Sequence, residues 1–378
     1  MIYRVMIMRK TAEKALTAIK IAVLLSVLIF CLADTTLCTK AIGESIMRCL
    51  NVVIPSLFAV MAVSSLIVKS GILTLIPKCF GRISRFLFGI EGNILPIFIF
   101  GMFAGYPVGV KMLCDEYSAG RITKKRAEIL SGLCFGAGPA FIFGCISGQL
   151  YSSDGAGKVI LLSNICANLL LLLIMSPYLR KTASVSAVKR EFRFSAEMFT
   201  ESVAQSGRAM ADICIMITIF SVINVFFIRI GAAAAVGELL MKLPSLDRIS
   251  GEALVAALSD VTNVSVFPRG DWLLLPYISG LVSFGGVCVM FQLSAAAGRR
   301  ISIAPLVIMR CTAAVMSGFV CRLIMPFFME YETAEVSAVV VEKVRSSTPV
   351  PSLMLIIMTV MVMIEFGKNS SKKLSEST

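Results

Sequence analysis

Three charged residues lie inside or beside apolar stretches of this sequence: Lys111, Asp260 and Arg310. A charge at membrane depth is costly, so such a residue usually faces a cavity or a partner. An arginine there can bind a carboxylate through two parallel hydrogen bonds, whereas an aspartate can bind a cation or a proton. The alternatives are that Arg310 pairs with Asp212 or Asp260 or reaches the membrane surface, and that Asp260 lies in an interfacial loop.

Glycine and proline interrupt the apolar run that leads to Lys111. The segment reads Gly105-Tyr106-Pro107-Val108-Gly109-Val110-Lys111. Glycine permits a tight turn and a close backbone approach, and Pro107 prevents a continuous helix. Because Tyr106 supplies a hydroxyl and Lys111 a cation, the segment is consistent with a turn that faces a substrate. A kinked helix with a lysine that reaches the membrane surface explains the pattern equally well.

Other interrupted segments carry the remaining candidate binding residues. Phe135-Gly136-Ala137-Gly138-Pro139 resembles an unwound helix, although small residues also serve close helix packing. In addition to Arg310 and the residues of segment 105–111, the candidates are Gly138, Pro139, Asp260, Thr262, Asn263, Gly285, Gly286 and Gln292.

The residues that are absent argue against an enzyme. The chain has no histidine, which removes serine or cysteine catalysis with histidine, histidine metal sites and histidine proton relays. We find no paired catalytic acids, nucleophile motif or nucleotide-binding motif. The 12 cysteines form no CxxC pair and lie mostly in apolar runs, where cysteine behaves as a small apolar residue. We therefore expect no metal, no cofactor and no disulfide framework.

The composition is that of an integral membrane protein. Of 378 residues, 57% are apolar and 16% are charged, and the mean hydropathy is +0.87. Apolar runs of about 18 residues or more indicate transmembrane helices, and the chain has room for about eight. The expected spans are 21–33, 51–68, 127–150, 156–177, 209–228, 272–293, 303–328 and 350–366.

The basic residues predict the orientation of these spans. Lys and Arg gather in the N-terminus and in segments 69–91, 111–126 and 180–208. Cytoplasmic loops carry such an excess, so the N-terminus is expected in the cytoplasm and the net charge of +13 does not indicate nucleic acid. Segment 92–111 is basic on both sides, which favours a re-entrant hairpin over a straight span.

The two halves of the chain resemble each other. Residues 60–71 resemble 220–231, residues 131–143 resemble 279–291, and an interrupted segment lies between each pair. The charge-based topology gives the halves opposite orientations, a pattern that points to a secondary transporter. The expected units are an N-terminal signal anchor (1–40), a first repeat (41–180) with hairpin 92–111, a basic cytoplasmic loop (181–208), a second, inverted repeat (209–329) with hairpin 250–268, an external acidic loop (330–349), and a C-terminal helix with a basic tail (350–378).

These motifs resemble a known family. The matching segments are Pro55-Ser56-Leu57-Phe58, residues 105–111, residues 138–144, and Phe284-Gly285-Gly286 with Gln292. They are similar to the sporulation integral membrane proteins of the YlbJ (SpoVV) family, which belong to the nucleoside-recognition or gate-domain membrane proteins of spore-forming Firmicutes. The resemblance implies a fold akin to concentrative nucleoside transporters. It also implies movement of dipicolinic acid from the mother cell across the outer forespore membrane.

We therefore predict an all-α polytopic transporter in the cell membrane or the outer forespore membrane. Its expected partners are the lipid bilayer and a small anionic substrate, with assembly into homo-oligomers left open. Dipicolinate is a dianion at neutral pH, and Lys111, Arg310 and helix N-termini would suit it. A carrier for nucleosides or other small solutes is the alternative in the same class. A scaffold of spore maturation is the alternative of another class, and would tolerate loss of Lys111 or Arg310.

Overall fold

The described residues of the computed structural model are entirely helical in their regular structure. They comprise 17–18, 21–71, 78–92, 94–118, 120–181, 192–244, 246–298 and 300–335. Five helices in these ranges are long and apolar enough to cross a membrane, namely Thr35–Ile67, Asp154–Lys181, Ala196–Arg229, Trp272–Ala297 and Ala304–Phe328. The chain is therefore an α-helical membrane-embedded protein.

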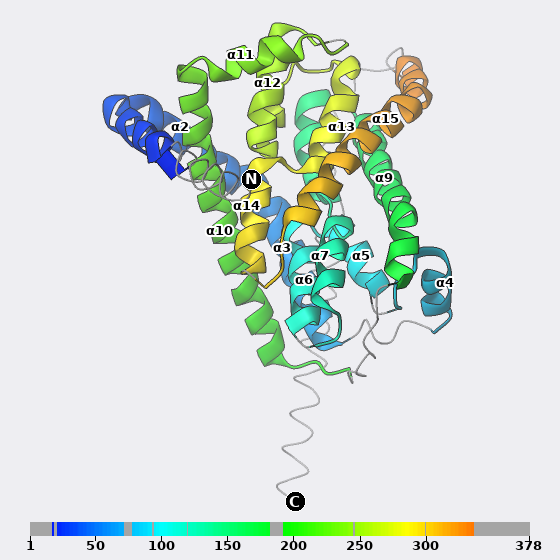
Figure 1. The fold of residues 1–378 in the computed structure, drawn as a ribbon. Coiled ribbons are helices and arrows are strands. Elements are labelled where there is room, and N and C mark those ends of the chain that lie inside the picture. Colours follow the sequence, from blue (N-terminus) through cyan, green and yellow to red (C-terminus); the bar gives the residue numbers. More distant parts are fainter. Residues whose placement is uncertain are drawn as a thin grey trace, which may run out of the picture.

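The order of elements in the first half is repeated in the second (Figure 1). Each half has a long helix, a short helix, a pair of short segments, an interrupted helix and a second long helix. The first half contains α2 (Thr35–Arg48), η1 (Cys49–Val53), α3 (Ile54–Ser70), α4 (Lys78–Phe88), α5 (Ile94–Phe103), α6 (Tyr106–Ser118), α7 (Lys124–Leu133), α8 (Pro139–Phe141), η3 (Ile142–Tyr151) and α9 (Asp154–Lys181). The second contains α10 (Ala196–Arg229), α11 (Ala232–Leu240), α12 (Arg248–Ser259), η4 (Val261–Val266), η5 (Trp272–Leu274), α13 (Leu275–Phe284), α14 (Gly286–Ala297) and α15 (Ala304–Glu335).

The paired short segments of the two halves begin at opposite ends of the molecule. Figure 1 shows α4 and the end of α6 at the bottom and α11 at the top. At the bottom, which we call the α6 end, Arg300 after α14 lies 3.7 Å from the carboxylate of Asp115 in α6. At the top, which we call the α11 end, the hydroxyl of Tyr277 in α13 donates to the carbonyl of Pro244, 2.6 Å away. The two interrupted helices run between these ends in opposite directions.

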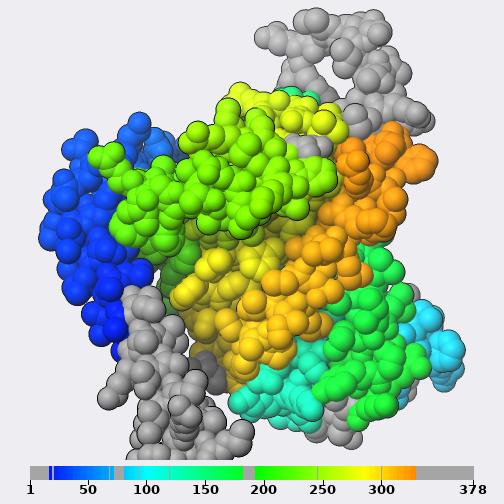
Figure 2. Space-filling model, turned by 45° about the horizontal axis from the view of Figure 1, so that its top comes forward, coloured from blue at the N-terminus to red at the C-terminus, as the bar shows by residue number. Residues whose placement is uncertain are grey.

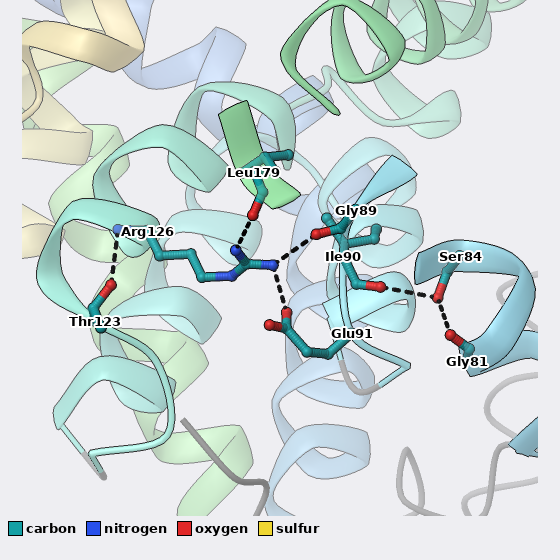
Figure 3. Close-up of polar contacts among 8 residues, drawn as sticks. All are labelled: Gly81, Ser84, Gly89, Ile90, Glu91, Thr123, Arg126 and Leu179. Carbon is teal, nitrogen blue, oxygen red and sulfur yellow. Dashed lines mark hydrogen bonds and ion pairs between the residues drawn. The ribbon is translucent and has the colours of Figure 1, made fainter. Parts of the chain in front are cut away.

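The base of the first pair, α5 and α6, is held by a buried arginine (Figure 3). Arg126, only 1% exposed, donates to the carbonyl of Leu179 at 2.7 Å and to that of Gly89 at 2.9 Å. It also contacts the carboxylate of Glu91 at 2.8 Å. Gly89 and Glu91 precede α5, whereas Arg126 follows α6. The arginine therefore ties the entrance and exit of the α5–α6 pair to the end of α9.

The helix α15 has the sidedness expected of a helix between protein and lipid. Its outward residues Ile308, Val315 and Phe319 are 69%, 75% and 65% exposed, whereas Arg310 is fully buried. Apolar side chains on the outer surface and a polar one inside reverse the pattern of a soluble protein. Figure 2 shows α15 crossing one face of the molecule between α14 and α9.

Several helices are longer than the sequence indicates. The span expected at 51–68 begins at Thr35, because the Asp34 carboxylate accepts a hydrogen bond from the Leu37 amide at 3.3 Å and so caps the helix. The helix α10 begins inside the loop predicted at 181–208, since the Ser195 hydroxyl caps it in the same way. The helix α15 continues to Glu335, into the loop predicted at 330–349. Residues 350–378 lie outside the described ranges.

The described residues contain five helices long and apolar enough to cross a membrane, so the expected count of eight spans stays a prediction. The apolar helix Ile21–Ala33 is short, and its end packs on α10, where the rings of Phe30 and Phe226 lie 5.5 Å apart. The span expected at 127–150 is interrupted between α7 and α8. The helix expected at 350–366 falls outside the described residues.

Candidate functional site

Both interrupted helices break where they meet the tip of the α5–α6 pair. The first break is Cys134–Gly138, between α7 and α8, and the second is at Gly285, between α13 and α14. Tyr106, the first residue of α6, donates its hydroxyl to the carbonyl of Val282 at 2.9 Å. A helix that stops inside a protein leaves backbone groups that need new partners. Tyr106 supplies one such partner to the second break.

The ring of Phe135 joins these pieces into what we call the central cluster: Tyr106, Phe135, Gly285 and Arg310. The Phe135 and Tyr106 rings lie 4.8 Å apart, and the Arg310 guanidinium carbon lies 4.9 Å from the Phe135 ring centre. Gly285 has a φ of +89°, and a Cβ there would lie 2.8 Å from Phe135 Cζ. Only glycine satisfies both the backbone and the contact.

Arg310 is a fully buried cation without a polar partner among the described residues. None of its three guanidinium nitrogens has a hydrogen-bond partner there, and it forms no ion pair with Asp212 or Asp260. A cation over an aromatic face gains about 0.5–2 kcal/mol, which is less than the several kcal/mol that burying a charge costs. Such a residue persists where a function requires it.

Two further buried groups near the breaks lack partners in the described structure. Asn168 in α9 donates its amide to the Phe135 carbonyl at 2.9 Å, but its own oxygen accepts no hydrogen bond. Ser283, two residues before Gly285, has an unsatisfied hydroxyl. Buried polar atoms are normally satisfied, so orphan groups on the segments around both breaks point to water or a ligand.

The residues of the second broken segment form a separate polar group. Asp260, Thr262 and Asn263 are at least 93% buried, so Asp260 is not exposed on the surface of the protein. The Asp260 carboxylate accepts from the Thr262 amide at 3.0 Å and so begins η4. Arg48 donates to the Asn263 side-chain oxygen at 2.5 Å and to the Thr262 hydroxyl at 3.4 Å. Gly286 packs against the backbone that links α12 to η4.

The glycines of the predicted turn serve the packing of the α5–α6 pair. A Cβ on Gly109 would overlap the Cys134 carbonyl oxygen at the start of the first break. Gly105 lies between α5 and α6, and its backbone is next to that of Gly138. Gly138 in turn is the residue before α8, which begins at Pro139. The predicted turn and the first break are therefore in direct contact, as a shared site requires.

Lys111 does not reach this cluster. With Pro107 it lines a pocket of about 80 Å³ between α3, α6, α10 and α14, and Arg310 is not part of the lining. Gln292 is buried in α14 and donates to Cys288 on its own helix at 3.3 Å. The predicted site residues thus fall into four places, with Gln292 apart from all of them. These are the central cluster, the contact between the predicted turn and the first break (Gly105, Gly109, Gly138 and Pro139), the buried polar group beside Arg48 (Asp260, Thr262 and Asn263, with Gly286 packed against it), and the pocket (Pro107 and Lys111).

Several polar and charged residues around these places were not identified from the sequence. Asn164, one turn before Asn168, donates to the Ser279 hydroxyl in α13 at 3.4 Å. The two asparagines lie four residues apart in an apolar run, a spacing that places both on one face of a helix and could have marked them. Lys69, which also lines the pocket, lies 3.0 Å from the carboxylate of Glu201. Arg48, Lys69 and Glu201 carry no comparable signal, because they are charged residues near helix ends. Their roles depend on contacts between segments far apart in the chain.

The fold and site define a class: a polytopic α-helical membrane protein whose interrupted helices meet at a buried polar cluster. Within the described residues there is no group of three His, Cys, Asp or Glu residues that could hold a metal ion. No protein-family model, curated protein or solved structure matches this chain significantly. The function is therefore argued from the site itself.

Proposed function

We propose that this protein is a secondary transporter that moves a small carboxylate anion, and that the central cluster holds its substrate-binding arginine. The observation that carries the proposal is the convergence of two helix breaks and the α5–α6 tip on Arg310, which is fully buried and lacks a polar partner among the described residues. A guanidinium binds carboxylate by paired hydrogen bonds. In a second conformation the cluster would open and the anion would satisfy it.

We further propose that the chain crosses the membrane about eight times and that the α5–α6 and α12–η4 pairs are re-entrant hairpins from opposite sides. The Arg126 contacts support this for the first pair, because they join its entrance to its exit. The α6 end faces the cytoplasm in this proposal, since basic residues cluster there. Inverted repeats with broken helices are the architecture of alternating access.

The first substrate to test is dipicolinate. The resemblance to sporulation membrane proteins points to export of this dianion from the mother cell across the outer forespore membrane. The central cation over an aromatic ring suits a planar aromatic carboxylate, because the anion can pair with the guanidinium while its ring packs on Phe135. Nucleosides lack the negative charge that Arg310 would balance.

The decisive experiment measures dipicolinate in spores of a deletion strain that carries the wild-type chain, Arg310→Met or, as a control, Arg322→Met. Arg322 lies on the same helix but is exposed. We expect low dipicolinate without the gene, restoration by the wild type and Arg322→Met, and no restoration by Arg310→Met. Equal protein levels in the membrane fraction are the second readout.

The contrary outcomes separate the alternatives. Normal dipicolinate in the deletion strain would remove this substrate, and uptake of nucleosides and other carboxylates into vesicles would then be compared. Restoration by Arg310→Met would contradict the carrier site. A scaffold would also tolerate Arg310→Met but would fail when the basic segment 111–126 is altered.

A further inference from the structure

The pocket beside Lys111 has the chemistry of an anion site, although it is distinct from the central cluster. Two amines, Lys69 from α3 and Lys111 from α6, line it together with the polar side chains of Ser65 and Gln205. Lys111 forms no hydrogen bond or ion pair within the described residues. Its charge interacts first with that of Asp115, which lies one turn later on α6 and also lines the pocket, and then with that of Lys69. The two amines repel each other, and a bound anion would offset this repulsion.

One of these amines already forms an ion pair with a carboxylate of the protein. Glu201 from α10 lies 3.0 Å from the Lys69 amine, and its side chain is 68% exposed, whereas that of Lys69 is 23% exposed. The Asp115 carboxylate, which also lines the pocket, lies 3.7 Å from the Arg300 guanidinium. The Lys69 nitrogen is itself buried and its contact with the exposed Glu201 does not form a hydrogen bond, so a second carboxylate that hydrogen-bonds to this amine can displace Glu201.

We propose that this pocket is an entry site for the transported anion at the α6 end, and that Glu201 is a built-in competitor for Lys69. The inference rests on the proposed transport function. One carboxylate of the substrate would take the place of Glu201 on Lys69, and Lys111 would bind the other charge. Because the pair joins α3 to α10, its exchange would also remove one of the polar links between these two packed helices.

Binding of pyridine-2,6-dicarboxylate to the purified full chain tests the proposal by titration calorimetry in nanodiscs of neutral lipid. We expect Glu201→Gln to tighten binding about two- to fivefold, the equivalent of a weak surface ion pair. Lys69→Met should weaken binding at least tenfold. Glu197→Gln is the matched control, because it removes the same charge from an exposed position one turn earlier on α10.

An anionic lipid headgroup has the same chemistry as a soluble carboxylate, so the lipid composition is the second arm. The comparison is made at an ionic strength that screens the membrane surface charge, because an anionic bilayer otherwise repels a dianion. Under these conditions we expect a soluble ligand to bind with equal affinity in neutral nanodiscs and in nanodiscs with phosphatidylglycerol. Weaker dicarboxylate binding in phosphatidylglycerol would show that the headgroup occupies Lys69, and would overturn the proposal.

The entry-site proposal and the proposal for the central cluster can be overturned independently. Binding that survives Arg310→Met but is lost in Lys69→Met supports the entry site. Binding that is unchanged in both Glu201→Gln and Lys69→Met but is lost in Arg310→Met overturns the entry site and leaves the carrier intact. Absence of binding by the wild-type chain, together with normal spore dipicolinate in the deletion strain, overturns the proposed substrate and the entry site together.

Discussion

At the scale of single residues, Arg310 is a position where a substitution should impair transport without lowering stability. It is a fully buried cation that the described protein leaves without a hydrogen-bond partner. Replacing buried ionic groups by apolar ones is often neutral or stabilising by about 1–4 kcal/mol. We therefore expect Arg310→Met to keep or raise the unfolding temperature of the purified protein while reducing vesicle uptake of dicarboxylate more than tenfold.

The control for this prediction is Arg322→Met, which should change neither quantity. A large fall in the unfolding temperature of Arg310→Met would mean that Arg310 has a structural partner. The transport defect would then have to be attributed to misfolding.

A second prediction at this scale concerns the stability cost of a side chain at Gly285, in the second break. Its φ of +89° disfavours any side chain, and a Cβ would lie 2.8 Å from Phe135. Gly231 is the matched control, because its φ is +74° but nothing lies within 4 Å of a Cβ there. Backbone strain costs about 1–3 kcal/mol and overpacking about as much again. Thermal unfolding should therefore show a clearly larger loss for Gly285→Ala than for Gly231→Ala, and equal losses would mean that the contact with Phe135 is not tight.

At the scale of elements, the α5–α6 pair depends on Arg126. Removing one partner of a buried ion pair typically costs about 3–5 kcal/mol, and Arg126 also satisfies the carbonyls of Gly89 and Leu179. We expect Arg126→Ala to lower the unfolding temperature and to make the segment before α5 sensitive to protease. Lys124→Ala, an exposed position on the same helix, should resemble the wild type. Unchanged protease resistance in Arg126→Ala would show that other contacts hold the pair.

At the scale of the whole molecule, the proposed topology places the α6 end inside the cell and the α11 end outside. Lys124 and Arg269 are exposed at these two ends. In intact cells, a membrane-impermeant maleimide should label Arg269→Cys above the background of the parent chain. It should label Lys124→Cys only after the membrane is opened. Labelling of both positions from one side would contradict the inverted arrangement.

Several features of this protein follow from the sequence alone because they depend on local chemistry. Apolar length predicts helices in a membrane, and the glycine-rich stretches at 135–139 and 284–286 indicate either an unwound helix or close helix packing. The structure contains a helix break at each of them. The likeness of residues 131–143 and 279–291 indicates the repeated order of elements that the structure contains. Helix ends were less predictable, since capping by Asp34 and Ser195 extends helices into stretches that hydropathy assigns to loops.

The site itself depends on contacts that only the tertiary structure decides. The side chains of Phe135 and Arg310 are neighbours although they lie in different halves of the chain, and Lys111, expected to join Arg310, lies in a separate pocket. Helical periodicity indicates which side of a helix faces inward, but it does not specify which neighbour that side meets. The pairing of Lys69 with Glu201 is decided in the same way, by how α3 packs against α10.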